Sequence, residues 1–287
     1  MIIISADDFG ICPQVNDAIV ELHSRERITS TAIMVPAQAY RQAATACRDN
    51  SAISCGVHLT LTSNYAIAPL QPITCTTEVG SLVDDSGRFH FTTDQFFARG
   101  TPADALIEAK AQIEQALADG IDVTHLDSHE GTLQLAPQFA EIYLQLATEY
   151  DLPLRMASPS LLAQLGLDSS WLDKARQRGI HFPDNLIYLP FYRFATRAKK
   201  ETFLLQLIES LPAGVTEFYF HPSFDSPAAR KLALSSPEAR DLPDPDLSWK
   251  VRLFDYQILS TSSLNEALRQ AGAILLNYKS LRILMRL

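Results

Sequence analysis

The chain has 287 residues, of which 47% are hydrophobic and 20% are charged, so it has the composition of a folded protein with a sizeable core. Its formal net charge of −9 argues against a nucleic-acid partner, because such a partner requires clustered Lys and Arg. No stretch approaches the roughly 18 apolar residues of a membrane span, and Asp7 and Asp8 interrupt the opening apolar run, so neither a membrane partner nor a signal peptide is expected.

The chain opens with Met-Ile-Ile-Ile-Ser-Ala-Asp-Asp-Phe-Gly at residues 1–10, which predicts a buried strand with an acidic end. Neighbouring carboxylates raise each other's pKa unless a cation lies between them or one of them holds a proton. Asp7 and Asp8 therefore indicate a metal site or a proton-transfer role. The alternative interpretation is that both residues cap the following turn and helix.

Helical and strand patterns then alternate along the chain. Residues 13–24 have an apolar stripe at helical spacing, and residues 29–35 favour a second strand. In the third predicted strand, residues 55–62, His58, Thr60 and Thr62 share one face, which would line an interior or a cleft. Further strands are predicted at 122–128, 152–156, 186–189, 217–222 and 273–278.

Two segments, at about 63–98 and 223–248, have weak periodicity and many prolines, and we expect long loops there that contact a substrate. The strand-then-helix order elsewhere predicts a parallel sheet. The chain length suits a single α/β domain, an irregular (β/α)7–8 barrel of the TIM type that spans residues 1–287.

In such a barrel the carboxyl ends of all strands meet on one face, so distant residues converge there. Two imidazoles and one carboxylate form a common site for a divalent ion, and Asp8, His58 and His125 fit that pattern. Each residue also has a structural interpretation: a strand histidine can be a hydrogen-bonded core residue, and Arg155 can pair with a carboxylate. The candidate residues at predicted strand ends are Asp7, Asp8, His58, His125, Asp127, His129, Arg155 and His221.

The motifs together resemble the YdjC-like carbohydrate deacetylases, a family that includes the chitooligosaccharide deacetylases. The resemblance rests on Ala6-Asp-Asp-Phe-Gly10, Gly56-Val-His-Leu-Thr60, Thr124-His-Leu-Asp-Ser-His129, Pro153-Leu-Arg155 and Phe220-His-Pro222, and it covers nearly the whole chain. One departure lies after His129, where Glu130-Gly131-Thr132 replaces the histidine-rich continuation that is common in the family.

The resemblance implies a (β/α) barrel, one divalent metal ion (Mg²⁺ or Zn²⁺) and hydrolysis of the acetamide of an N-acetylated sugar such as N-acetylglucosamine or its oligomers. It implies that Asp8, His58 and His125 are the metal ligands and that Asp7 is the general base. We further assign His221 to protonation of the leaving amine and Arg155 to orientation of Asp7. Asp127 and His129 could be outer-shell groups.

Two other functions remain open on the sequence alone: a metal-dependent hydrolase of another amide or a phosphoester, and a non-catalytic sugar-binding relative. The expected partner is a small carbohydrate, and a homodimer is compatible with the sequence. Four cysteines without a CxxC pair favour reduced thiols and the cytoplasm. Aromatic side chains that could stack on sugar rings are Tyr65, Phe89, Phe91, Tyr192 and Trp249.

Overall fold

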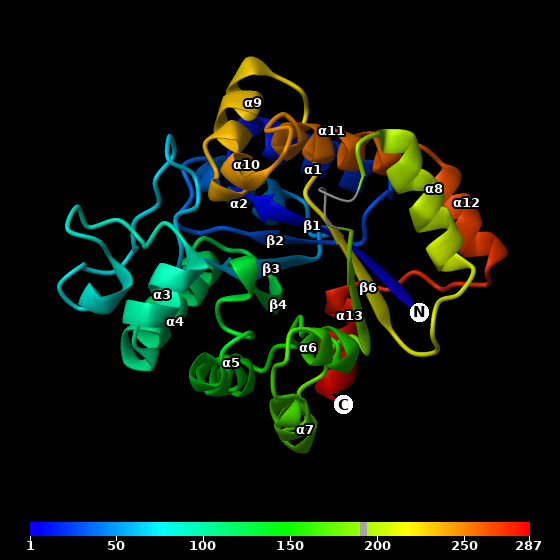
Figure 1. Cartoon of the computed structure of the whole chain (residues 1–287). Helices are drawn as coiled ribbons and strands as arrows, with labels where there is room; N and C mark the ends of the chain where they lie inside the picture. The colour runs from blue at the N-terminus through cyan, green and yellow to red at the C-terminus, as the bar shows by residue number, and fades with distance from the viewer. Residues whose placement is uncertain (190–193) are drawn as a thin grey trace.

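A computed structural model describes residues 1–189 and 194–287 (Figure 1). Its strands are β1 (Ile2–Phe9), β2 (Ser30–Ile33), β3 (Cys55–Leu59), β4 (Val123–Ser128), β5 (Asn185–Tyr188) and β6 (Thr216–Phe220). Its longer helices are α1 (Pro13–Ser24), α2 (Tyr40–Asp49), α4 (Pro102–Ala118), α5 (Pro137–Tyr150), α8 (Arg197–Ile208) and α11 (Leu247–Ser260). Shorter helices are α3 (Thr93–Arg99), α6 (Pro159–Gln164), α7 (Ser170–Gln177), α9 (Pro227–Leu234), α10 (Pro237–Asp241), α12 (Ser263–Gln270) and α13 (Tyr278–Met285), with 3-10 turns at Gly80–Leu82 and His129–Gly131.

In the described residues the strands form one six-stranded sheet in the order β4-β3-β2-β1-β6-β5, and every pair is parallel. The sheet is curled, and helices lie around its outside (Figure 1). β1 is central, with β2 on one side and β6 on the other, and all eight of its residues are buried. Burial on both faces explains the continuous Ile2-Ile3-Ile4 run, because an exposed face would require polar residues in alternation.

The predicted α/β class and parallel sheet are confirmed, whereas a full barrel is not. Within the described residues, segment 152–156 makes a single bridge to the sheet, Leu126 to Leu154, and segment 273–278 makes one bridge, Ile2 to Leu275, before α13 begins. Pro153 explains part of this difference, because proline has no N–H to give to a ladder. The sheet is therefore a half-barrel whose open side is partly covered by irregular chain.

The two predicted long loops also need correction. Segment 223–248 contains helices α9 and α10, each of which starts with a proline after a serine cap, and segment 63–98 ends in α3. Pro227 and Pro237 occupy the first helical turn, where the missing N–H removes no hydrogen bond. Two of the prolines that suggested a loop therefore start helices. No helix in the described part of the chain is long and apolar enough to cross a bilayer.

Candidate active site

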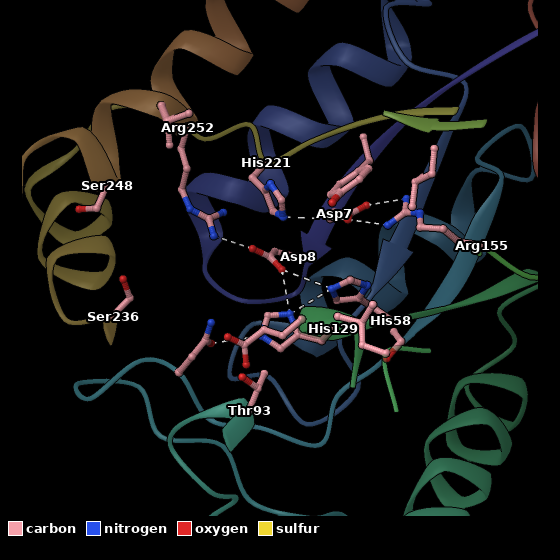
Figure 2. Close-up of a pocket in the computed structure, with 18 of the residues that line it drawn as sticks. Asp7, Asp8, His58, Thr93, His129, Arg155, His221, Ser236, Ser248 and Arg252 are labelled. Carbon is pink, nitrogen blue, oxygen red and sulfur yellow. Dashed lines mark hydrogen bonds and ion pairs between the residues drawn. The ribbon is translucent and has the colours of Figure 1, made fainter. Parts of the chain in front are cut away.

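The carboxyl ends of β1, β3 and β4 bring together three buried side chains from Asp8, His58 and His129 (Figure 2). His58 Nε2 and His129 Nδ1 are 3.1 Å apart, and Asp8 Oδ1 is 3.5 Å from each of these nitrogens. Three ligand atoms of this kind lie close enough together to hold a metal ion. We call Asp8, His58 and His129 the central cluster.

The outer nitrogen of each imidazole in the central cluster already has a partner. His58 Nδ1 is 2.7 Å from Asp127 Oδ1, and His129 Nε2 is 3.2 Å from Asn64 Oδ1. Both partners are hydrogen-bond acceptors, so the remaining nitrogens of His58 and His129 are free to bind a cation as neutral imidazoles. This arrangement matches metal sites in which an outer carboxylate or amide fixes the tautomer of each ligand histidine.

Asp8 Oδ1 is buried, has no hydrogen-bond partner among the described residues, and faces the two imidazole nitrogens at 3.5 Å. A buried carboxylate oxygen without a partner costs about 1 to 3 kcal/mol or more, which a bound cation would remove. Two nitrogens and one carboxylate oxygen suit a divalent ion that keeps open positions for water and substrate. The residues of the central cluster therefore fit the metal that the resemblance implies.

The backbone explains how Asp7 and Asp8, neighbours on one strand, both reach the cavity. Successive strand residues point to opposite faces, but Ala6 pairs with Thr31 and Phe9 pairs with Ile33, so β1 has one extra residue between them. Asp8 lies at this irregularity with a φ of 64°. The left-handed conformation, which is unfavourable for a residue with a side chain, turns Asp8 towards the same side as Asp7.

The pKa shifts of the central cluster follow from the charges packed around it. Although burial opposes ionisation, Arg252 and the two imidazoles hold the pKa of Asp8 well below its usual range. Burial alone would lower the pKa of His58, but Asp127 and the carboxylates of β1 raise it to about 10. The carboxylates around His58 therefore favour a positive charge at the central cluster.

His125 was the expected third ligand, and the structure places it elsewhere. Its ring stacks on Tyr278 at 3.7 Å between centroids and occupies the space next to Gly56, where any side chain would clash with it. Within β4, His125 lies two residues deeper than Asp127, towards the end of the sheet that α13 covers. Among the described residues that could hold an ion, His129 and not His125 is grouped with Asp8 and His58, so we propose His129 as the third ligand.

Asp7 is held by a buried guanidinium. Arg155 Nη1 and Nη2 donate to Asp7 Oδ2 and Oδ1 at 2.6 and 2.8 Å, and the same guanidinium contacts Asp127 at 2.7 Å. Its Nε and Nη2 also donate to Glu217 Oε1 at 3.0 and 2.7 Å. One guanidinium therefore contacts three buried carboxylates, and the role of Arg155 in orienting Asp7 stays a prediction.

His221 follows the end of β6 and lies on the other side of Asp7, with its Nε2 4.0 Å from Asp7 Oδ2 (Figure 2). Its backbone N–H donates to Asp255 Oδ2 at 3.0 Å, and the second oxygen of Asp255 pairs with the buried Lys200. Burial lowers the pKa of His221, although Asp8 and Asp7 act in the opposite direction. The imidazole is therefore neutral near pH 7.

Sequence reasoning missed Arg252, which reaches the site from α11. Its Nη2 donates to Asp8 Oδ2 at 2.6 Å and to the hydroxyl of Tyr65 at 2.5 Å. α11 also carries Asp255, three residues later, so one face of this helix contacts Asp8 through Arg252 and His221 through Asp255. Nothing in the sequence around Arg252 marks it as a site residue, because it lies in an ordinary amphipathic helix.

These groups form part of the lining of a cavity of about 890 Å³. Such a volume is in the range of small-molecule sites and fits one or more sugar rings. Of the aromatic residues considered for sugar stacking, Tyr65 lines the cavity, Phe89 is buried in the core and Trp249 contacts the Arg230 guanidinium. Tyr192 lies outside the described residues.

A substitution at Asp127 tests the outer part of the central cluster. We expect Asp127→Asn to weaken metal binding about 10- to 100-fold, because it removes the carboxylate that fixes the His58 tautomer. Titration of metal into the apo variant, followed by calorimetry, measures this loss. Wild-type affinity in the variant would show that His58 does not depend on Asp127.

The chain was also compared with known proteins. The sequence profile of the family described as YdjC-like protein matches residues 1–270. A carbohydrate deacetylase of Enterococcus faecalis is 30% identical over 282 residues, with 98% of this chain and 97% of that protein covered. A carbohydrate deacetylase of Thermoanaerobacter pseudethanolicus is also 30% identical, with 98% and 99% covered.

A solved structure has a fold similar to that of this chain. A candidate cellobiose-phosphate cleavage protein from Enterococcus faecalis V583 superposes with a TM-score of 0.81 at 29% sequence identity, and the match covers 98% of both chains. The fold of this chain therefore has a counterpart over nearly the full length of that protein. By its sequence profile and its full-length relatives, this chain belongs to the YdjC-like family.

Proposed function

We propose that the protein is a metal-dependent hydrolase that removes the acetyl group from an N-acetylated sugar of the N-acetylglucosamine type. The central cluster carries this proposal, since Asp8, His58 and His129 converge at a cavity beside the buried pair of Asp7 and Arg155. Relatives of the same length that are named carbohydrate deacetylases support the sugar as substrate.

The metal would be held by Asp8, His58 and His129, and either Zn²⁺ or Mg²⁺ is compatible with this set. When bound, a divalent ion supplies Lewis acidity, which polarises a carbonyl and lowers the pKa of water. The protein groups supply the proton transfers. Asp7 is the group that accepts the first proton, because two hydrogen bonds from Arg155 hold the Asp7 carboxylate in a fixed orientation at the cavity.

In the proposed reaction Asp7 accepts the proton of the water that attacks the acetyl carbon. The leaving nitrogen must be protonated, because an amide anion is a very poor leaving group. His221 is 4.0 Å from Asp7 Oδ2 and neutral, so its Nε2 can take that proton from Asp7 and deliver it to the leaving nitrogen, which returns Asp7 to its carboxylate form. Because the pKa of His221 is lowered, its protonated form is a stronger acid than that of an ordinary histidine.

The charge pattern disfavours a two-metal phosphoesterase. Asp7, His58 and Asp127 form a second group that could hold an ion, yet Arg155 Nη1 already lies 2.6 Å from Asp7 and 2.7 Å from Asp127. A guanidinium that contacts both carboxylates leaves no need for a second cation there. One metal ion per chain is the stoichiometry that this arrangement supports.

The test is a screen for product release with metal-loaded protein on N-acetylglucosamine, its short oligomers and other N-acetylated sugars. We expect acetate release that a chelator abolishes and that added metal restores. Phosphate release from sugar phosphates would instead favour the phosphoesterase. Bound metal and bound sugar without any turnover would identify a non-catalytic sugar-binding protein.

A further inference from the structure

The turn directly after His129 contains a backbone conformation that is costly for its residue. Glu130 has φ 52° and ψ 15°, in the left-handed region, and Gly131 follows at φ 69°. A side chain at position 131 would meet Leu135 Cδ1 at 2.7 Å, so the turn also requires glycine there. Left-handed conformation in a non-glycine residue persists only where the surroundings impose it, often at a binding site.

The conformation brings a carboxylate to the wall of the cavity. Glu130, Gly131 and His129 all line it, and Glu130 Oε2 accepts a hydrogen bond of 2.6 Å from the hydroxyl of Thr62. Thr62 is fully buried, so its hydroxyl holds the Glu130 carboxylate from the protein interior. The turn itself is held by hydrogen bonds from Thr132 N to His129 O and from Leu135 N to Gly131 O.

We propose that Glu130 is a specificity-determining residue that accepts hydrogen bonds from hydroxyl groups of the sugar ring. This inference rests on the proposed deacetylase function and names what recognises its substrate. A carboxylate only accepts hydrogen bonds, as it does from Thr62, so it suits donors such as hydroxyls better than the acceptor oxygen of an acetyl group. Glu130 therefore places an acceptor-only group on the wall of the cavity, next to His129 of the central cluster.

The test uses Glu130→Gln and Glu130→Gly, with Glu26→Gly as the matched control. Glu26 also has a positive φ, of 56°, but it lies in the exposed turn after α1. We expect both Glu130 variants to raise KM about 10- to 100-fold and to change kcat less than about threefold, because hydrogen bonds to a charged group contribute to ground-state binding. Glu26→Gly should keep the wild-type KM.

Stability separates this role from a structural one. In Glu130→Gly the relief of the left-handed conformation offsets the lost contact with Thr62, so its melting temperature should stay within about 4 °C of that of the wild type. A large drop in melting temperature with an unchanged KM would make Glu130 a structural residue and overturn the proposal.

Deoxy sugars identify the contacted hydroxyls. The 3-, 4- and 6-deoxy forms of N-acetylglucosamine are compared in wild type and in Glu130→Gly. For a contacted hydroxyl, its removal should weaken binding in the wild type and cause no further loss in the variant. If removal of each hydroxyl weakens binding by the same factor in the wild type and in Glu130→Gly, Glu130 contacts none of these hydroxyls and the proposal is overturned. If the wild type releases no acetate from any sugar, the proposed function fails, and calorimetric binding of the same sugars still tests Glu130.

Discussion

Replacing Asp7 with asparagine is expected to lower kcat for acetate release by about 1000-fold or more while leaving the metal bound. Asp7 belongs to the proton-transfer side of the site and not to the central cluster, so its charge is needed for catalysis and not for metal retention. Asparagine keeps the volume and can still accept from Arg155 but cannot take a proton at neutral pH. Acetate release and the metal content of the same sample give both quantities.

Glu217→Gln is the matched control for the Asp7 variant. Glu217 accepts from the same guanidinium as Asp7 but lies deeper, where Ser5 and Tyr278 also donate to it. Burial raises the pKa of Glu217, and glutamine keeps the shape of the side chain and a carbonyl oxygen that can accept from the guanidinium. We expect this control to keep kcat within about tenfold. Equal losses in both variants would mean that Asp7 acts through Arg155 alone and is not the base.

The second large effect is the loss of the metal from His129→Ala. We expect a decrease in affinity greater than the roughly 10- to 100-fold that an outer-shell partner contributes, and His58→Ala should behave in the same way. His125→Phe should keep the metal, because phenylalanine preserves the stack on Tyr278 and removes a buried Nε2 that has no hydrogen-bond partner. Elemental analysis of the three purified variants measures the outcome.

This set of variants decides between the sequence prediction and the structure. Metal loss from His125→Phe with retention in His129→Ala would restore His125 as the ligand and refute the central cluster. His125→Ala is a less useful probe, since a cavity beside Tyr278 would cost about 3 to 5 kcal/mol and could unfold the protein. Circular dichroism melting curves of His125→Phe and His129→Ala establish that both are folded.

The sequence was sufficient to predict that strands carry polar residues towards their carboxyl ends, because an Ile-rich run stops at Asp7 and alternating runs contain His58 and Asp127. It also predicted that Arg155 lies beside Asp7, as it does, whereas the position of His221 near Asp7 was not predicted. The alternation of polar and apolar residues does not show how far each residue of a strand lies from the cavity. His125 and Asp127 share a face of β4, but His125 lies three residues before the strand end at Ser128 and is not part of the cavity lining.

Other features depend on contacts between distant segments and leave no local signal. The extra residue in β1 that turns Asp8 is defined only by its pairing with β2. Arg252 meets Asp8 across 244 residues of chain, and its helix has no composition that marks a site. The prolines of segment 223–248 suggested loops because proline breaks the interior of a helix. Proline is also favoured in the first turn of a helix, and the sequence alone does not distinguish these two positions.

The central position of β1 has a consequence for biosynthesis. Its partner β6 ends at Phe220, so one edge of the first strand stays unpaired while some two hundred residues leave the ribosome. An open edge on an isoleucine-rich strand can pair with other chains. A nascent chain that stops before β6 should therefore aggregate, and chaperones that cover exposed strand edges should associate with such truncated products.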